Sequence, residues 1–359
     1  MQNLMQLTET VKETYGSLPS YEVSSETISL TDTGCLDTGK NQFPVLFESQ
    51  DQLADKTHIP KHFFQELPPN LQAVLFNWRW QRAISDGVIP RHMRVNLNAA
   101  NQVIGFDDPR LLRISLVKLM EVIRLSLPKE LSPEQVSVAR FDSTPQRLWI
   151  SCFSPDKRGQ PRAGDIINGG VDVVHYLSGN KGTQISCYLR RLQCANGAVV
   201  HVCRDDHPLR ARRLLNGRFD EADMLGQIHR LLSEAWTQLP EKMRAIEELR
   251  DKDRMPIEYL RQQRTRFSLN ERMLTAIERA INQDELGPTG KQWDIFNALS
   301  RVATHDESLT FRQRRTLSRM AGEFSQQTAH RCAQCGQWVR EQDDAHTDDS
   351  VLQEQDQSE

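Results

Sequence analysis

The chain lacks several features that would assign it to a functional class at once. No apolar run approaches the ~20 residues that a membrane-spanning helix needs, and the stretch MQNLMQLTETVKETYG has neither the basic nor the apolar region of a secretion signal. Neither glycine-rich phosphate loop, GxxxxGK[ST] or GxGxxG, occurs. The seven cysteines are scattered and odd in number, which argues against a secreted disulfide framework. We therefore expect no membrane partner, a cytoplasmic location and no nucleotide-binding loop.

Charge is distributed unevenly along the chain. Residues 1–60 hold nine acidic and three basic residues, net −6, and residues 341–359 hold eight acidic and no basic residues, net −8. Because the whole chain carries −3, the part between them, 61–340, carries +11. A basic body between acidic ends is typical of proteins that bind a polyanion, although an ordinary solvated surface has the same composition.

The hydrophobic pattern predicts an α+β fold. Apolar residues from Val171 to Tyr176 and from Ile185 to Leu192 flank a turn at 178–182, and the second arm alternates apolar and polar positions. Asn196-Gly197 predicts a second reversal before a short strand at 198–202. These stretches form a central antiparallel β-meander. Hairpins are expected at 93–106 and 136–153, a polar loop at 159–164, and a buried helix opening at Asp107.

Helical periodicity appears in two places. The helix that is expected after Pro68-Pro69 repeats apolar side chains at 3.6-residue spacing, which predicts a buried face made of Leu71, Val74, Leu75, Trp78 and Ile84. From residue 218 onward the pattern is helical, with a first helix expected to end at Pro240 and a later one to begin at a capping box, Ser268 to Glu271.

Composition divides the chain into four segments. We expect a loosely ordered acidic N-terminal arm at 1–58, an α+β core domain at 59–217, a helical region at 218–328, and a CxxC segment with a disordered acidic tail at 329–359.

Basic residues gather around the predicted meander, with an aromatic residue among them. Positive charge can follow a phosphate backbone and rings can stack on bases, so this set predicts a single-strand nucleic-acid site. The residues are Lys181, Tyr188, Arg190, Arg191, Arg210, Arg212 and Arg213. A second basic set, Arg250, Lys252, Arg254, Arg261, Arg264 and Arg266, is interspersed with acids and favours a solvated helix surface.

The segment around His330, Cys332 and Cys335 is half of a zinc knuckle. Two thiolates at i and i+3 suit tetrahedral zinc, but a structural site needs four ligands and a second CxxC is missing. A structural zinc, a site shared across a homo-oligomer, and two reduced thiols all fit this pattern. No other cofactor is expected. Cys194 has no base at a diagnostic spacing, so we expect no catalytic residue.

Three stretches together are similar to one known family. They are the strand and turn from Val103 to Asp108; a run with a Gly-Asp start, a Ser-Gly turn and a Cys-x-Asn-Gly end; and a helix with Trp, Asn and Ala. The family is the phage/plasmid-like proteins of unknown function (domain of unknown function 932), and the likeness covers roughly residues 65 to 325. The motif residues are Gly164, Asp165, Ser178, Gly179, Cys194, Asn196, Gly197, Trp293, Asn297 and Ala298.

This resemblance implies a mobile genetic element, and such elements often carry their own DNA recombination proteins. We therefore predict a non-catalytic nucleic-acid-binding accessory protein, with single-stranded DNA annealing or recombination as its expected role. Two alternatives stay open: a protein-interaction module that modulates a host system, and a metal-dependent enzyme that uses Asp165 and nearby histidines.

Overall fold

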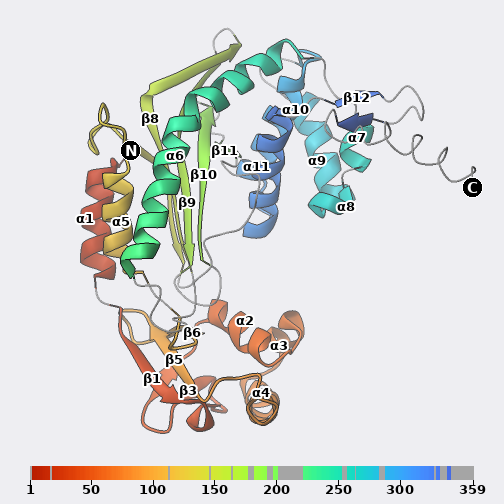
Figure 1. Cartoon of the computed structure of the whole chain (residues 1–359). Helices are drawn as coiled ribbons and strands as arrows, with labels where there is room; N and C mark the ends of the chain where they lie inside the picture. Colours follow the sequence, from red (N-terminus) through yellow and green to blue (C-terminus); the bar gives the residue numbers. More distant parts are fainter. Residues whose placement is uncertain are drawn as a thin grey trace, which may run out of the picture. The chain divides into compact units, whose positions relative to one another are not determined.

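The computed structural model describes residues 2–16, 18–111, 114–144, 147–162, 165–176, 182–191, 197–200, 221–252, 257–262, 264–282, 288–326, 329–331 and 338–340 (Figure 1). Helices and antiparallel sheets occur together, which confirms the α+β prediction. The chain divides into two compact units: one comprises Met1–Cys152, Val171–Ile185 and Asp205–Trp236, and the other Phe153–Gly170, Ser186–Arg204 and Thr237–Glu359. This division differs from the four consecutive segments that composition predicts.

The first unit begins with α1, Leu4–Tyr15, where the sequence predicts a loose arm. A capping box starts this helix: the Asn3 side chain accepts from the backbone N–H of Gln6, and the Gln6 side chain accepts from that of Asn3. Leu4, Leu7 and Val11 share one helical face and are fully buried, and α1 lies against α5, Leu116–Leu125. The i, i+3, i+7 spacing of these three residues gives the segment a buried face despite its acidic composition.

Two small sheets and three helices form the rest of the N-terminal part of this unit. One sheet has the order β1-β5-β6, with strands Ser20–Ser24, His92–Leu97 and Val103–Asp107; the other has β2 Ser29–Leu30, β3 Cys35–Asp37 and β4 Gln42–Pro44. The short 3-10 turn η1, Ser25–Thr27, links β1 to β2. Helices α2 Phe47–Lys56, α3 Lys61–Glu66 and α4 Pro69–Ser85 follow, and one apolar core joins these helices to both sheets.

The predicted hairpin of 93–106 is confirmed as the antiparallel pair β5–β6, with Val95 opposite Phe106. The predicted helix start at Asp107 is wrong: Asp107 ends β6, and α5 begins at Leu116 after Ser115. The apolar face of α5 is buried as expected, through Leu119, Met120 and Ile123.

The predicted meander is a five-stranded sheet in the order β11-β10-β9-β8-β7. Its strands are β7 Ser137–Thr144, β8 Arg147–Arg162, β9 Asp165–Tyr176, β10 Thr183–Arg191 and β11 Gly197–Val200. Two-residue connections can join only antiparallel strands, which sets the direction of β7, β8 and β9, and β10 pairs antiparallel with β11. β8 runs to Arg162, so the polar loop expected from 159 is largely strand.

Helix α6, Glu221–Glu247, continues through Pro240, where the sequence predicts its end. Proline removes one helical hydrogen bond, so packing on both sides of it must hold the helix. In the second unit, Leu239 and Met243 are buried against strand β9 at Gly169, where a Cβ atom would lie 2.9 Å from Leu239 Cδ1 and 2.7 Å from Met243 Sδ. Glycine at 169 therefore lets helix and strand approach closely.

The remaining elements of the second unit are mostly helical: η2 Glu248–Arg250, α7 Ile257–Gln262, α8 Arg264–Phe267, α9 Glu271–Asn282, α10 Gln292–His305 and α11 Phe311–Gln326, followed by the strand pair β12 Ala329–Arg331 and β13 Trp338–Arg340. The cap of α9 is Asn270, whose side chain accepts from the backbone N–H of Met273 at 2.9 Å, and the predicted capping box at Ser268 is wrong. Among the residues described, no helix is long and apolar enough to cross a membrane.

Candidate functional site

The predicted nucleic-acid residues fall largely outside the described chain. Lys181, Arg210, Arg212 and Arg213 lie there entirely, and Arg191 is described only as the last backbone position of β10. Of the two side chains that are described, Tyr188 is buried and Arg190 is partly exposed. Tyr188 is only 7% exposed, which leaves its ring no open face for a base, and the guanidinium of Arg190 lies 4.9 Å from the ring centroid of Phe153.

The second basic set, between residues 250 and 266, has the ion pairs that are expected of a solvated helix surface. Arg250 pairs with Asp251, and Lys252 lies 4.0 Å from Glu248. Arg261 pairs with Glu278 at 2.8 Å, and Arg264 with Glu271 at 3.3 Å. Each described cation of this set therefore has a neighbouring carboxylate. The side chains of Arg254 and Arg266 lie outside the description.

The family-motif residues divide in the same way. Gly164, Ser178, Gly179, Cys194 and Asn196 lie outside the described residues, while Asp165 and Gly197 are backbone positions at the starts of β9 and β11. The third motif lies in α10, where Trp293, Asn297 and Ala298 are all buried.

Asp294, next to Trp293, makes several hydrogen bonds at the start of α10. Its carboxylate accepts from the backbone N–H groups of Thr289 and Gly290 and from the Thr289 hydroxyl, at 2.7 to 3.0 Å. The start of α10 is thus attached to the loop before it, and the three motif residues of this helix are part of its buried surface.

The predicted zinc ligands lie mostly outside the described residues. Cys332 and Cys335 lie outside the described residues, and His330 is described only as a backbone position in β12 paired with Val339. In the described part of the chain, no group of three or more His, Cys, Asp or Glu side chains could hold a metal ion.

Polar groups at the end of β6 serve the fold of the first unit. Asn96 donates to the Asp107 carboxylate at 2.6 Å. Burial lowers the pKa of the nearby Lys56 ammonium, and the carboxylates of Asp107, Asp108 and Asp55 partly oppose that shift. Because α2 also accepts a hydrogen bond from Phe106 N–H through the Gln52 side chain, this network joins α2 to β6.

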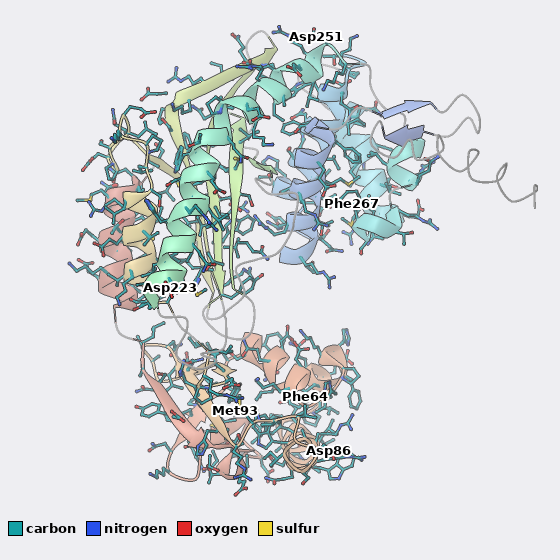
Figure 2. The ribbon with its side chains drawn as sticks, in the orientation of Figure 1. Phe64, Asp86, Met93, Asp223, Asp251 and Phe267 are labelled. Atoms are coloured by element: carbon teal, nitrogen blue, oxygen red, sulfur yellow. The ribbon has the colours of Figure 1, made fainter. Side chains whose placement is uncertain are left out.

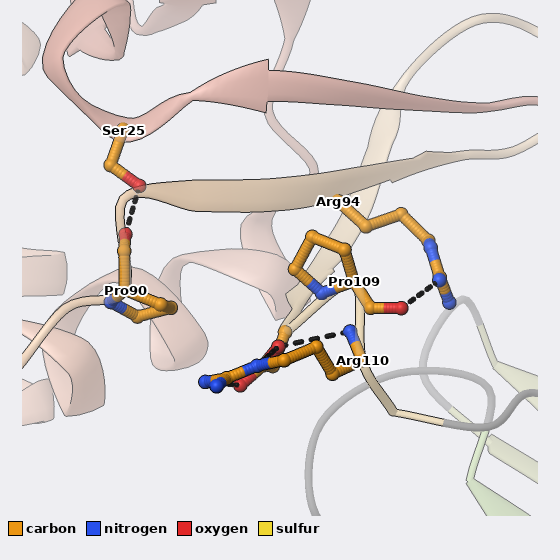
Figure 3. A network of polar contacts seen from close by, with 6 residues as sticks. Ser25, Pro90, Arg94, Pro109 and Arg110 are labelled. Atoms are coloured by element: carbon orange, nitrogen blue, oxygen red, sulfur yellow. Dashed lines mark hydrogen bonds and ion pairs between the residues drawn. The ribbon is translucent and has the colours of Figure 1, made fainter. Parts of the chain in front are cut away.

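Two arginines close the turn that follows β6 (Figure 3). Arg94 donates to the carbonyl oxygens of Pro109 and Leu111, and Arg110 makes a two-pronged pair with Asp108. That pairing raises the pKa of Arg110. Arg94 and Arg110 already form hydrogen bonds or an ion pair with neighbouring groups, so they are poorly suited to bind a polyanion.

A second polar cluster lies on strands β8 and β9 of the five-stranded sheet, among residues of the first unit. The buried Asp172 carboxylate accepts from Trp149 Nε1 and Ser151 Oγ, each at 2.5 Å, and Arg140 lies 4.1 Å from the centroid of the Trp149 ring. Burial raises the pKa of the adjacent Cys152 thiol to about 12, so this thiol is not a nucleophile at neutral pH.

The feature that sequence reasoning missed is the outer face of α4. Leu71, Val74 and Trp78 are 48%, 65% and 57% exposed, and Asp86 marks the carboxyl end of their helix in Figure 2. We call these three residues the α4 stripe. Positions i, i+3 and i+7 fall within an arc of about 60° on a helix, so the three side chains form one continuous row.

The opposite face of α4 fills the core of the first unit. Ala73, Phe76, Trp80 and Ala83 are buried there. The predicted buried face is therefore wrong for Leu71, Val74 and Trp78, whereas Leu75 and Ile84 are partly buried against the core. The helix carries apolar residues on two sides, and both sets follow a 3.6-residue period. Periodicity alone therefore cannot select the inner one.

Hydrogen bonds from three side chains to the backbone fix α4 in place. The Asn77 amide accepts from Leu30 N–H at 2.7 Å and donates to Leu30 C=O at 2.9 Å. Trp80 Nε1 donates to Ser25 C=O at 2.8 Å, and Gln72 Nε2 donates to Phe64 C=O at 2.8 Å. The α4 stripe is thus presented on a rigid helix.

Exposed apolar residues are concentrated in the part of the sequence that contains this helix. Of the nine large apolar residues that are exposed in the described part of the chain, six lie between 47 and 88: the α4 stripe with Phe47, Phe63 and Val88. A row of exposed apolar side chains on a fixed element is a common mark of an interaction site.

No protein-family model, curated protein or solved structure matches the chain. The resemblance to phage/plasmid-like proteins stays a prediction.

Proposed function

We propose that this protein is a binding module that recognises another protein through the α4 stripe. The observation that supports this proposal is the exposure of Leu71, Val74 and Trp78 on a helix whose other face is buried. Among the alternatives that the sequence leaves open, this corresponds to the protein-interaction module. A host protein is the expected partner if the chain belongs to a mobile genetic element.

Energetics are consistent with a recognition role. Fully burying a side chain of this kind contributes about 1.5–3 kcal/mol, so covering the exposed half of three such residues contributes about 3 kcal/mol. A contribution of about 3 kcal/mol changes a dissociation constant roughly a hundredfold.

A matched pair of variants tests this function. Val74 and Val88 are both exposed valines, at 65% and 57%, but only Val74 belongs to the α4 stripe. We expect full-length protein to recover a specific partner from lysate of its own cells, Val88→Ser to recover the same partner, and Val74→Ser to lose it. Equal recovery by both variants, or no partner in any sample, would reject the proposal.

Nucleic-acid binding is a second candidate, supported by the charge of +11 carried by residues 61–340. In this proposal the acid-poor stretch with Lys181, Arg190, Arg191, Arg210, Arg212 and Arg213 binds the phosphates of single-stranded DNA during annealing or recombination. Tyr188 is not included because it is buried.

Titration with labelled single-stranded DNA at two salt concentrations tests this second candidate. Binding through several phosphates must weaken steeply as salt rises, because each contact releases counterions. Absence of binding at low salt, or binding that ignores salt, would remove it.

A further inference from the structure

We propose that α4 acts as a preformed helical ligand, inserting the α4 stripe into an apolar groove with an acidic rim on the partner protein. This inference rests on the proposed protein-binding function and names the chemistry of the partner surface. It is carried by three properties of the helix: the width of the stripe, the way the helix is held, and its charge.

The stripe is narrow and short. Its three side chains span about 60° of the helix circumference and ~10 Å of its length, whereas a helix face that packs on a broad surface spans 100° or more. Anchors at i, i+3 and i+7 are the pattern by which a single helix fills a groove. Width and spacing therefore favour a groove over a flat apolar surface.

The helix is ordered before it meets a partner. Asn77, Trp80 and Gln72 hold it through the hydrogen bonds described above, and Phe76 stacks on Trp80 with ring centroids 5.1 Å apart. A flexible peptide would lose conformational freedom on entering a groove, but α4 has already lost it. Affinity can therefore come from a small contact area.

Charge identifies the rim of the groove. Within Pro69–Ser85 there are two arginines and no acidic residue. The guanidinium of Arg79 lies 5.6 Å from the ring centroid of Trp78, beside the largest anchor, and donates to His58 C=O. Arg82 makes only an exposed pair with Asp86, at 3.7 Å, which contributes little. Carboxylates beside the groove would therefore meet cations along α4.

A second copy of this chain fits less well. Two copies of α4 would bring no carboxylate of either helix to the arginines of the other.

The test places the photoreactive amino acid benzoylphenylalanine at position 74 of the full-length protein, and at position 88 as the control. After irradiation in cells, mass spectrometry identifies the cross-linked peptide, and the partner is then purified for affinity measurements. We expect position 74 to cross-link to a segment that lines an apolar groove with Asp or Glu at its edge, and position 88 not to do so.

Affinity measurements with the purified partner then test each anchor. We expect Trp78→Ala to weaken binding roughly 30- to 100-fold and Val74→Ser roughly tenfold, while Val88→Ser stays within about twofold. Arg82→Glu should weaken binding about fivefold, and more at low salt, because it removes attraction to an acidic rim. Circular dichroism on each variant checks that the fold is unchanged.

The outcomes separate this inference from the function on which it rests. If no protein is cross-linked or recovered, the protein-binding function and the groove both fail. If a partner binds and the α4 variants leave its affinity unchanged, or if Arg82→Glu strengthens binding, the function stands and the groove is rejected. Cross-linking to lipid, to nucleic acid or to another copy of this chain also rejects the groove.

Discussion

Helices α4 and α10 are both rich in large apolar residues, but they are covered differently. In the second unit, α10 contacts α9, α11 and β11, and residues 292 to 300 are all buried. In the first unit, α4 buries one face and leaves the α4 stripe exposed. Tryptophan marks both helices, so a tryptophan in the sequence does not reveal its role. What decides the role is how many sides of the helix the rest of its unit covers.

The largest expected effect separates the two faces of α4. Trp80 is fully buried, so we expect Trp80→Ala to lower the free energy of unfolding by about 3–5 kcal/mol, while Trp78→Ala stays within about 0.5 kcal/mol. Trp293→Ala in α10 should resemble Trp80→Ala. Urea unfolding followed by circular dichroism measures all three. Equal losses for Trp78 and Trp80 would contradict the assignment of inner and outer faces.

Two glycines also differ in how closely other atoms surround them: Gly169 lies beside α6 and Gly226 lies within it. A Cβ atom at Gly169 would lie 2.7 Å from Met243 Sδ, whereas a Cβ atom at Gly226 would meet nothing within 4 Å. We expect Gly169→Ala to destabilise by about 1–3 kcal/mol through overpacking. Gly226→Ala should stabilise by up to about 1 kcal/mol through helix propensity. Thermal unfolding measures whether each variant is more or less stable than the wild type. A gain in stability for both variants would refute the close approach at Gly169.

A smaller effect tests how α10 is attached. Asp294→Ala leaves the N–H groups of Thr289 and Gly290 without their carboxylate, and we expect a loss of about 1–2 kcal/mol. Glu307→Ala, an exposed acidic residue beyond the end of the same helix, is the control and should change little. A negligible loss for Asp294→Ala would show that burial alone positions α10.

The smallest effect is a pH dependence in the loop between α10 and α11. The Ser308 hydroxyl and N–H donate to Asp306, and the hydroxyl contributes most to lowering the pKa of that carboxyl below 3.8. A lowered folded-state pKa means that this stabilisation is present above pH 3.8 and is lost as pH falls through the folded value. Carboxyl NMR titration of wild type and Ser308→Ala measures it, and the variant should titrate at higher pH. Identical titration curves would remove this contact.

The sequence predicts well where local pattern and burial agree. The meander of β9, β10 and β11 has clear alternation and turn dipeptides, and α10 and α11 have long apolar stripes. Prediction fails where tertiary contacts decide: α6 passes Pro240 because Leu239 and Met243 are buried beside it, and α1 is ordered by three buried residues in a polar segment. Ser268 and Asn270 are both favourable N-cap residues and lie within one helical turn, so the sequence alone does not show that Asn270 is the cap of α9.

The candidate site was harder to predict than the fold. Apolar residues on α4 form two rows with the same period, and composition cannot tell which row meets the core. Positive charge predicted a site around the meander, but Tyr188 is buried and Lys181, Arg210, Arg212 and Arg213 lie outside the described residues. The second basic set, with Arg250, Arg261 and Arg264, has carboxylates beside it, as expected of a solvated helix surface. The positions of β1, β2 and η1 are needed to decide which row of α4 faces the core and which row is exposed.

Hydroxyl-radical footprinting of the full-length protein without a partner shows whether the outer face of α4 is open to solvent. Trp78 and Trp80 lie two residues apart in α4 and have the same intrinsic reactivity, but one is exposed and the other fully buried. We expect rapid oxidation of Trp78 and strong protection of Trp80. Protection of both tryptophans would mean that the outer face of α4 is already covered, and the α4 stripe could not be a free binding surface.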